Sequence, residues 1–410
     1  MKKITSCRLC GSPNIMEFLN LGNQPLANLL LKNPHEKEEF YPLSLSWCKE
    51  CSLVQLKHTI EPDKLFSNYV WVTSTSEAAK EHSMAFFKEV TSRAKDLKSS
   101  YVLEIASNDG TFLVPFMKNN YKVLGVDPAR NIADDAVSRG IPTKCAFFGV
   151  KTANEIVKEN NAAKVVIARN VLAHVANLHD FVNGLALCME AGGLLVLEVH
   201  YAKIILDELH YDSIYHEHLC YFTLKSLEAL LNMHGLYIED IGKSPISGGS
   251  LIVYARNIAA EEKPSVKKYR ESEEKSKVNE LFSWKNFTER VIVHKKKLLA
   301  ILAEASKEHG NIIGYGASAR SSTLLNYCGI NSGFISVIAD KNELKHGLYT
   351  AGTHILIESP ENAMARKPKY VFIMAWNFRD EIIKTLVDRF RYKGRFIVPL
   401  PKEPEVFSAA

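Results

Sequence analysis

Short apolar runs alternate with stretches of helical spacing through the middle of this chain. The apolar runs predict seven strands, at residues 101–106, 122–126, 143–148, 164–169, 193–199, 236–241 and 250–256. The first five alternate with helices, and a turn that contains Gly248 and Gly249 joins the last two. This order predicts a doubly wound α/β sheet whose last strand runs antiparallel. A nucleotide-like ligand would lie at the carboxyl ends of its first strands.

A second α/β pattern follows a change in composition. Residues 258 to about 310 are polar and charged, and we expect a linker that leads into a connecting helix over 291–309. Further strands are predicted from Asn311, at 335–340, at 370–375 and at 395–398, which indicates a Rossmann-like domain. The turn from Gly314 to Ala319 matches G-x-G-x-x-A, and the acidic Asp340 follows about 20 residues later.

Two Cys-x-x-Cys pairs precede the first α/β pattern. Four thiolates, from Cys7, Cys10, Cys48 and Cys51, would complete a closed tetrahedral zinc site with a structural role. The intervening residues 11–47 exceed the usual ribbon spacing and indicate a larger insertion. A redox dithiol is the alternative, which the absence of a thioredoxin-like βαβ context disfavours. We expect a zinc-binding module at 1–75, a central domain at 76–260, and a linker helix with the C-terminal domain at 261–410.

Composition and charge narrow the function classes. The 410 residues allow two or three domains, and 51 basic against 46 acidic side chains give a dispersed net charge of +5. We therefore expect no nucleic-acid or membrane partner, and nothing in the sequence indicates a protein partner. The amino terminus has no apolar stretch behind its lysines, and no run is long enough to cross a bilayer, so we expect a cytoplasmic protein. The remaining cysteines are scattered singly, as reduced core thiols would be.

The turn after the first predicted strand, with the sequence EIASNDG, is a candidate cofactor site. An acid at the tip of the second strand, Asp127, is placed to accept hydrogen bonds from both hydroxyls of a ribose. The turn has one glycine where a pyrophosphate fingerprint has three, and two carboxylates close by would repel a pyrophosphate. They suit the sulfonium and ammonium groups of S-adenosylmethionine; a plain αβ turn is the structural alternative. The candidate cofactor residues are Glu104, Ser107, Asn108, Asp109, Gly110 and Asp127.

Titratable side chains gather in the run Tyr215-His216-Glu217-His218, between apolar neighbours. Histidine accepts and returns protons near neutral pH, so this density suggests proton chemistry; a solvated loop or a satisfied core histidine is the alternative. His174 lies just beyond the carboxyl end of the fourth predicted strand, where this fold places active sites. Tyr69 is at a domain junction, where it either packs as an ordinary aromatic or points its hydroxyl into a cleft.

Taken together, these motifs resemble those of the S-adenosylmethionine-dependent deoxysugar C-methyltransferases, which act at C-3 of nucleotide-linked keto sugars. The resemblance covers essentially the whole chain: the paired CxxC motifs, EIASNDG, NVLAHV, YHEH, SGGSL and GYGASAR. It implies a class I methyltransferase fold with a seven-stranded sheet, a structural zinc on the four cysteines, and a C-terminal domain that closes over a nucleotide-diphosphate keto-deoxysugar. One departure is Ala106, which stands where many methyltransferases have the first glycine of the turn; we expect only a slightly different turn.

The resemblance also implies roles for individual residues. His218 would be the base that removes the proton beside a ketone to form an enolate, with Tyr215, Glu217 and His174 around the same centre and Tyr69 facing the sugar. Glu104 and Asp127 would hold the cofactor.

The chemistry fits these residue types, because carbon methylation needs a base and donors to the developing oxyanion, whereas oxygen methylation needs less. Two alternatives are a nicotinamide-dependent nucleotide-sugar oxidoreductase that uses the turn from Gly314 to Ala319, and a non-enzymatic zinc-containing binding protein.

Overall fold

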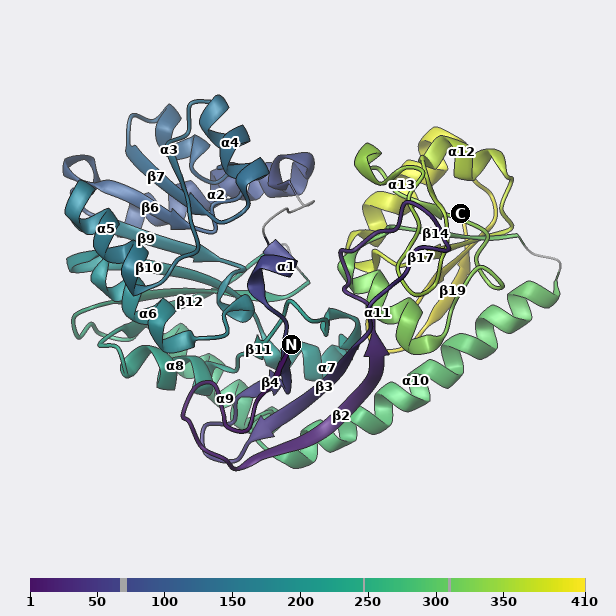
Figure 1. Ribbon diagram of the computed structural model, residues 1–410, viewed down its shortest axis with the longest axis horizontal. Coiled ribbons are helices and arrows are strands. Elements are labelled where there is room, and N and C mark those ends of the chain that lie inside the picture. The colour runs from purple at the N-terminus through teal and green to yellow at the C-terminus, as the bar shows by residue number, and fades with distance from the viewer. Residues whose placement is uncertain (67–71, 246–247, 309–310, 410) are drawn as a thin grey trace.

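The structure is a computed structural model that describes residues 1–66, 72–245, 248–308 and 311–409. It contains a seven-stranded sheet, a six-stranded sheet and a four-stranded sheet, with a short two-stranded pair beside them. Figure 1 shows the seven-stranded sheet with its helices on the left, the six-stranded sheet on the right, and the long strands of the four-stranded sheet running beneath both. The three larger sheets therefore form separate bodies that are bridged by other parts of the chain.

The seven-stranded sheet confirms the predicted doubly wound order. Its strands lie in the order β12-β13-β10-β9-β6-β7-β8, and β13 runs antiparallel to both of its neighbours. The central strands are buried along nearly their whole length, because helices cover both faces. The strands are β6 (Tyr101–Ile105), β7 (Lys122–Asp127), β8 (Thr143–Cys145), β9 (Ala163–Arg169), β10 (Met189–His200), β12 (Tyr237–Lys243) and β13 (Ser250–Arg256).

Helices precede and connect these strands. Residues 108–113 form a turn after β6, so the helix that follows begins only at Val114. The helices are α2 (Glu77–Arg93), α3 (Val114–Lys118), α4 (Arg130–Ser138), α5 (Val150–Asn160), α6 (Leu178–Leu187), α7 (Ala202–Glu208) and α8 (Leu224–Asn232).

The C-terminal sheet is Rossmann-like, as the sequence predicts. Its order is β16-β15-β14-β17-β18-β19, parallel except for β19, which runs antiparallel to β18. The elements are β14 (Ile312–Tyr315), α11 (Ala319–Cys328), β15 (Ile338–Ala339), β16 (Ile357–Glu358), α12 (Pro360–Ala365), β17 (Tyr370–Ile373), α13 (Arg379–Phe390), β18 (Arg395–Val398) and β19 (Glu405–Ser408).

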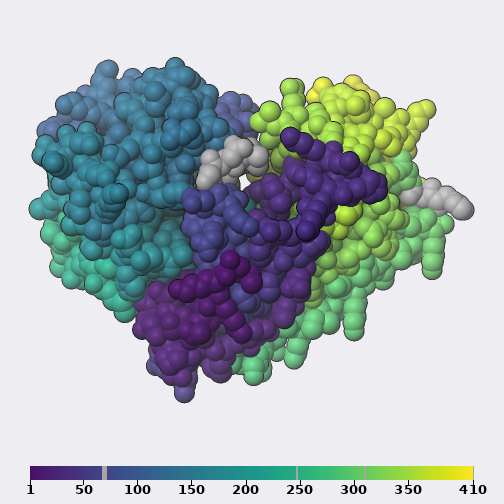
Figure 2. Space-filling model, in the orientation of Figure 1, coloured from purple at the N-terminus to yellow at the C-terminus, as the bar shows by residue number. Residues whose placement is uncertain are grey.

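The N-terminal module is a β-structure whose insertion reaches the C-terminal domain. Its four-stranded sheet joins β2 (Ile15–Gln24), β3 (Tyr41–Cys48) and β4 (Val54–Leu56) to β11 (Cys220–Tyr221), which lies directly after the Tyr-His-Glu-His run. Between β2 and β3 the chain crosses to the C-terminal domain, where Leu31 forms a β-bridge with Tyr349. Figure 2 shows this N-terminal part lying over the junction between the other two bodies. β1 (Lys2–Lys3) pairs with β5 (His58–Thr59), and α1 (Pro62–Phe66) follows.

The polar stretch after residue 258 is helical over more of its length than expected. α9 (Pro264–Ser276) packs against β12 and α8, where the buried carboxylate of Glu273 accepts a hydrogen bond from Leu224 N at the start of α8. α10 (Leu281–Lys307) then runs along the lower edge of the molecule to the C-terminal domain (Figure 1). Only a narrow stripe of residues on each of these two helices is buried, and the rest of each helix is largely polar. For this reason the composition of the segment resembled that of a linker.

Among the helices formed by the described residues, none combines the length and the apolar character that crossing a membrane requires.

Candidate active site

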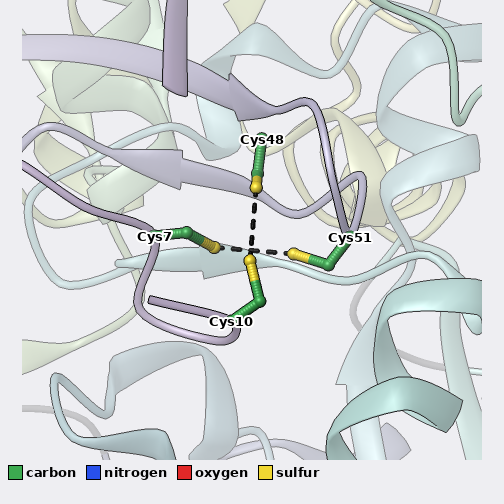
Figure 3. A group of neighbouring side chains, drawn as sticks. All are labelled: Cys7, Cys10, Cys48 and Cys51. Atoms are coloured by element: carbon green, nitrogen blue, oxygen red, sulfur yellow. Dashed lines mark hydrogen bonds between the residues drawn. The ribbon is translucent and has the colours of Figure 1, made fainter. Parts of the chain in front are cut away.

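Four cysteines from the two CxxC pairs converge between the first loop and the β3–β4 turn. Their Sγ atoms all lie within 4.8 Å of one another, with Cys7 and Cys51 3.5 Å apart and Cys10 and Cys48 3.5 Å apart (Figure 3). A tetrahedral zinc with bonds of about 2.3 Å to sulfur places its ligands about 3.8 Å apart. The cluster therefore fits a tetrahedral metal with four thiolate ligands and leaves no position open for a substrate.

The cysteine module is hydrogen-bonded to the Tyr-His-Glu-His run. β4 follows Cys51 and pairs with β11, and Leu56 N donates to Leu219 O at 2.9 Å. Leu219 N in turn donates to Ala173 O at 2.7 Å. Residue 218 is thereby held between the module on one side and the 3-10 turn Leu172–His174 on the other. The structural module thus fixes the position of the candidate base.

The candidate cofactor turn has two non-glycine residues in the left-handed region of φ. Ala106 has φ +54° and Asn108 has φ +50°, so the alanine adopts the backbone conformation that a glycine would adopt without strain. Gly110 has φ +75°, and a Cβ there would approach Ile141 Cδ1 to 2.5 Å, so this position requires glycine. Ser107 is buried, and its Oγ lies beside Gly125 of β7.

Asp127 ends β7 at the edge of this turn. Its Oδ2 accepts a hydrogen bond from Asn108 N at 2.9 Å, and its Oδ1 accepts one from Ala129 N at 3.0 Å. Burial raises the pKa of Asp127, while these two backbone donors act in the opposite direction. Each carboxylate oxygen keeps a further lone pair for a ligand hydroxyl.

Asn108 and Asp109 hold the preceding segment onto the turn. Asn108 Oδ1 accepts from Thr73 N at 2.9 Å, and Asp109 Oδ2 accepts from Ser74 N at 3.0 Å. Burial would raise the pKa of Asp109, but hydrogen bonds from Ser74 and Thr111 outweigh it and lower the pKa. These side chains are thus used within the protein, where they fix residues 73–74 over the turn.

Glu104 lies near the end of β6 with 1% of its surface exposed. Its Oε1 is 3.7 Å from Arg169 Nη1, and its Oε2 has no hydrogen-bond partner among the described residues. Burial raises the pKa of Glu104 to about 8, although the charge of Arg169 acts in the opposite direction. Arg169 also donates to the fully buried Glu198, at 2.9 Å from Nε to Oε2. A buried carboxylate oxygen without a partner suits a bound ammonium group.

Tyr215 and His218 form a hydrogen-bonded pair. His218 Nδ1 is 2.8 Å from Ser213 O, and because a carbonyl only accepts, Nδ1 carries the proton. In the neutral ring, Nε2 is therefore the acceptor of the Tyr215 hydroxyl, 2.8 Å away. Burial and the neighbouring His174 hold the pKa of His218 well below its usual range, so the ring is neutral at pH 7. Burial also raises the pKa of Tyr215 above its usual range, which keeps the phenol protonated.

Two further histidines flank this pair, and the rings of His174 and His218 have centroids 4.9 Å apart. Burial lowers the pKa of His174 to about 4, and its Nδ1 has no hydrogen-bond partner among the described residues. His200, at the end of β10, is 6.3 Å from His218 between centroids, and burial holds its pKa well below the usual range. Neutral imidazoles therefore surround the candidate base.

The other two members of the run point elsewhere. His216 is buried and donates from Nε2 to Tyr41 O of the N-terminal module at 3.2 Å. Glu217 Oε1 accepts a hydrogen bond from Asn28 Nδ2 at 2.6 Å, so the insertion of the cysteine module reaches the run as well. Tyr69, which the sequence also indicated, lies outside the described residues.

Several residues at this site were not singled out from the sequence. Arg169 ends the apolar strand β9 and Glu198 lies two residues before the end of β10, and a charged residue in such a strand is a signal that could have identified them. Asn28 and Trp376 come from distant parts of the chain and lie in no motif noted from the sequence, whereas Arg320 is the last residue of the GYGASAR motif. Their contribution depends on how the three bodies pack together.

The strand order and the cysteine cluster define a class I methyltransferase fold with an N-terminal metal-binding module. Family models agree along the chain: "Putative zinc binding domain" matches residues 7–66, "Methyltransferase domain" matches 79–241, and "C-methyltransferase C-terminal domain" matches 245–401. The predicted fold class is confirmed, and the chain is a methyltransferase.

Comparison with curated proteins identifies the family. The C-methyltransferase NovU of Streptomyces niveus is 34% identical over 416 residues, which cover 100% of this chain and 98% of that protein. This chain therefore belongs to the NovU family of C-methyltransferases. A ubiquinone biosynthesis O-methyltransferase of Rickettsia bellii is 20% identical over 165 residues, 40% of this chain and 61% of that protein. The structure of magnesium protoporphyrin IX methyltransferase from Synechocystis PCC 6803 overlaps with a TM-score of 0.33 at 13% identity, over 44% of this chain and 79% of that one.

Proposed function

We propose that this enzyme methylates the carbon next to the ketone of a nucleotide-activated keto-deoxysugar, with S-adenosylmethionine as donor and His218 as base. The observation that carries the proposal is the Tyr215–His218 pair, in which a neutral imidazole has its Nε2 lone pair directed at the Tyr215 hydroxyl. Methylation of an oxygen would not require such a cluster of groups that accept and donate protons. The membership in a C-methyltransferase family supports carbon as the acceptor.

The proton transfer follows from the tautomer of His218. Nε2 takes the proton from the carbon beside the ketone, and the electron pair of that C–H bond forms the enolate. The Tyr215 hydroxyl turns from Nε2 to the ketone oxygen and donates to it as negative charge develops, and His174 lies close enough to contribute a second donor. Ser213 O stabilises the imidazolium that results, through the Nδ1–H bond, until His218 releases the proton to solvent.

The turn after β6 has the donor set expected of an S-adenosylmethionine site. Glu104 has an unsatisfied carboxylate oxygen for the ammonium group, and Asp127 has lone pairs for the ribose hydroxyls. When bound, S-adenosylmethionine supplies an electrophilic methyl group, which leaves sulfur as the new carbon–carbon bond forms. The enolate must lie near the carboxyl ends of β6 and β9, where His174 follows the strand.

The sugar nucleotide would bind against the C-terminal domain. A groove there is lined by Asn28 of the insertion and by Ser318, Ser322 and Lys345 around the start of α11. Lys345 Nζ donates to Ala317 O at 2.7 Å, which places its charge at the turn. Asn28 connects this groove to Glu217, whose carboxylate we assign to a hydroxyl of the sugar.

The four-cysteine cluster is proposed to hold zinc with a structural role. All four ligand positions are occupied by thiolates, and the module holds β11 and the insertion in place. Its effect on the reaction is then to fix the position of His218.

Product analysis tests the proposal. Purified enzyme is incubated with S-adenosylmethionine and a panel of nucleoside-diphosphate 4-keto-deoxysugars, with or without an amino substituent, and the products are examined by mass spectrometry and NMR. The expected product has one methyl group on the carbon beside the ketone, and the His218→Gln variant should form none while still binding S-adenosylmethionine. A methyl group on oxygen, or transfer undiminished in His218→Gln, would contradict the proposal.

A further inference from the structure

Arg320 extends from the C-terminal domain toward the Tyr215–His218 pair. It is the second residue of α11, whose N-cap is Ser318, and α11 packs along the 3-10 turn Tyr211–Ser213 that precedes the pair. Thr323, one turn further along α11, donates to Ile214 O at 2.8 Å and fixes this packing. The groove is lined at this helix by the N-cap Ser318 and by Ser321 and Ser322, which lie on a different face from Arg320 and Thr323.

The guanidinium of Arg320 is held in place but is not saturated with hydrogen bonds. It lies over the ring of Trp376, 4.9 Å from its centroid, and its Nε is 3.5 Å from Asp212 Oδ2. That oxygen already accepts the indole N–H of Trp376 at 2.7 Å. Nε and Nη2 of Arg320 are buried and have no hydrogen-bond partner among the described residues. Buried N–H groups without an acceptor destabilise the fold, and a ligand that accepts hydrogen bonds from them would remove this cost.

The β12–β13 turn packs closely against the guanidinium of Arg320. Gly248 of the β12–β13 turn faces the guanidinium, and a Cβ at residue 248 would come within 2.9 Å of Arg320 Nη1. Burial and the charge of Arg320 both lower the pKa values of His200 and His210, although the carboxylate of Glu208 acts in the opposite direction on His210. The SGGSL and GYGASAR motifs therefore meet at one permanent positive charge beside the catalytic pair.

We infer that Arg320 binds the diphosphate of the substrate, at the phosphate nearest the sugar. This inference rests on the proposed function. A guanidinium is planar, permanently charged and able to donate two parallel hydrogen bonds, which matches phosphate oxygens. Binding there would place the sugar on the Tyr215–His218 side of α11 and the nucleoside on the side of the groove. Arg320 is therefore a residue that determines binding and position, and it takes no part in the proton transfer.

Calorimetric titrations of the full-length protein test this inference. Thymidine diphosphate, uridine diphosphate, the two nucleosides without phosphate, and S-adenosylmethionine are titrated separately into wild type, Arg320→Gln and Arg320→Lys. The matched control is Arg290→Gln, since Arg290 also bridges two parts of the molecule but has its donors on Leu206 O and Asp207 O, at 2.8 and 3.1 Å.

We expect Arg320→Gln to weaken binding of the nucleoside diphosphate by about 10- to 100-fold. Arg320→Lys should restore part of this loss, and Arg290→Gln should show none. The affinities for the nucleosides and for S-adenosylmethionine should be unchanged, which a general loosening of the domain junction would not allow. Undiminished nucleoside-diphosphate binding by Arg320→Gln would overturn the inference and leave the proposed function standing. Wild type that binds S-adenosylmethionine but neither diphosphate would overturn the sugar-nucleotide part of the proposed function, and the inference with it.

Discussion

The protonation of Glu104 should make S-adenosylmethionine binding depend on pH. With a pKa of about 8, the Glu104 carboxyl is largely protonated at pH 7 before the ligand binds. About one molecule in eleven then carries the carboxylate, so the affinity at pH 7 is about tenfold weaker than that of a fully ionised site, or about 1.4 kcal/mol. Because the ammonium group of the ligand favours the ionised carboxylate, affinity should rise as the pH increases from about 6 toward 8, above which deprotonation of that amino group opposes binding.

The direction of this effect is set by the raised pKa. A carboxyl whose pKa is raised by burial holds its proton in the free enzyme, and a bound cation lowers that pKa and displaces the proton. Binding at pH 7 should therefore release about 0.9 proton from Glu104. Calorimetric titrations in buffers with different ionisation enthalpies measure this release directly.

The matched control is Glu104→Gln. The amino group of the ligand itself titrates near pH 8, and the variant shares that effect. The ratio of wild-type to variant affinity therefore isolates Glu104, and it should increase about tenfold for each unit by which the pH is raised, up to about pH 8. A ratio that does not change between pH 6 and 8, or equal proton release by both proteins, would refute the reasoning about Glu104.

Three further changes should have separable effects. Ala106→Gly should raise the free energy of unfolding by about 1 kcal/mol, since the residue has φ +54°, whereas Ala129→Gly at φ −77° should lower it, both measured by denaturant titration. Cys48→Ser should lose bound zinc in metal analysis and unfold at a lower temperature, while Cys188→Ser should keep the metal; equal metal content would contradict the assigned cluster. Tyr215→Phe should lower kcat by about 10²–10³ without changing the affinity for S-adenosylmethionine, and a kcat near that of wild type would remove Tyr215 from the proposed mechanism.

The sequence was most informative where the pattern of apolar residues is local. The seven strands of the central sheet were predicted within a few residues, because each strand is a buried apolar run between turns. The left-handed conformation of Ala106 was not apparent from the sequence, because it depends on how the turn is held by the hydrogen bond from Asn108 N to Asp127. The polar residues 264–276 were expected to form a linker, and the structure shows that they form helix α9 instead.

The parts that could not be predicted depend on contacts between distant segments. The length of residues 11–47 indicated an insertion. Its crossing to the C-terminal domain and the hydrogen bond from Asn28 to Glu217 depend on tertiary packing, which the pattern of apolar residues does not reveal. In the same way, Arg320 is separated from Tyr215 by more than a hundred residues of sequence, and only the packing of α11 brings the two together.

The most direct test of the account is proton exchange by His218 in the absence of methyl transfer. The enzyme is mixed in D₂O with a nucleoside-diphosphate 4-keto-deoxysugar that it methylates and with S-adenosylhomocysteine, which cannot donate a methyl group. The account predicts that wild type replaces the proton beside the ketone with deuterium, as followed by NMR, and that His218→Gln does so about 10²–10⁴ times more slowly. Exchange that is equally fast in His218→Gln would contradict the assignment of His218 as the base.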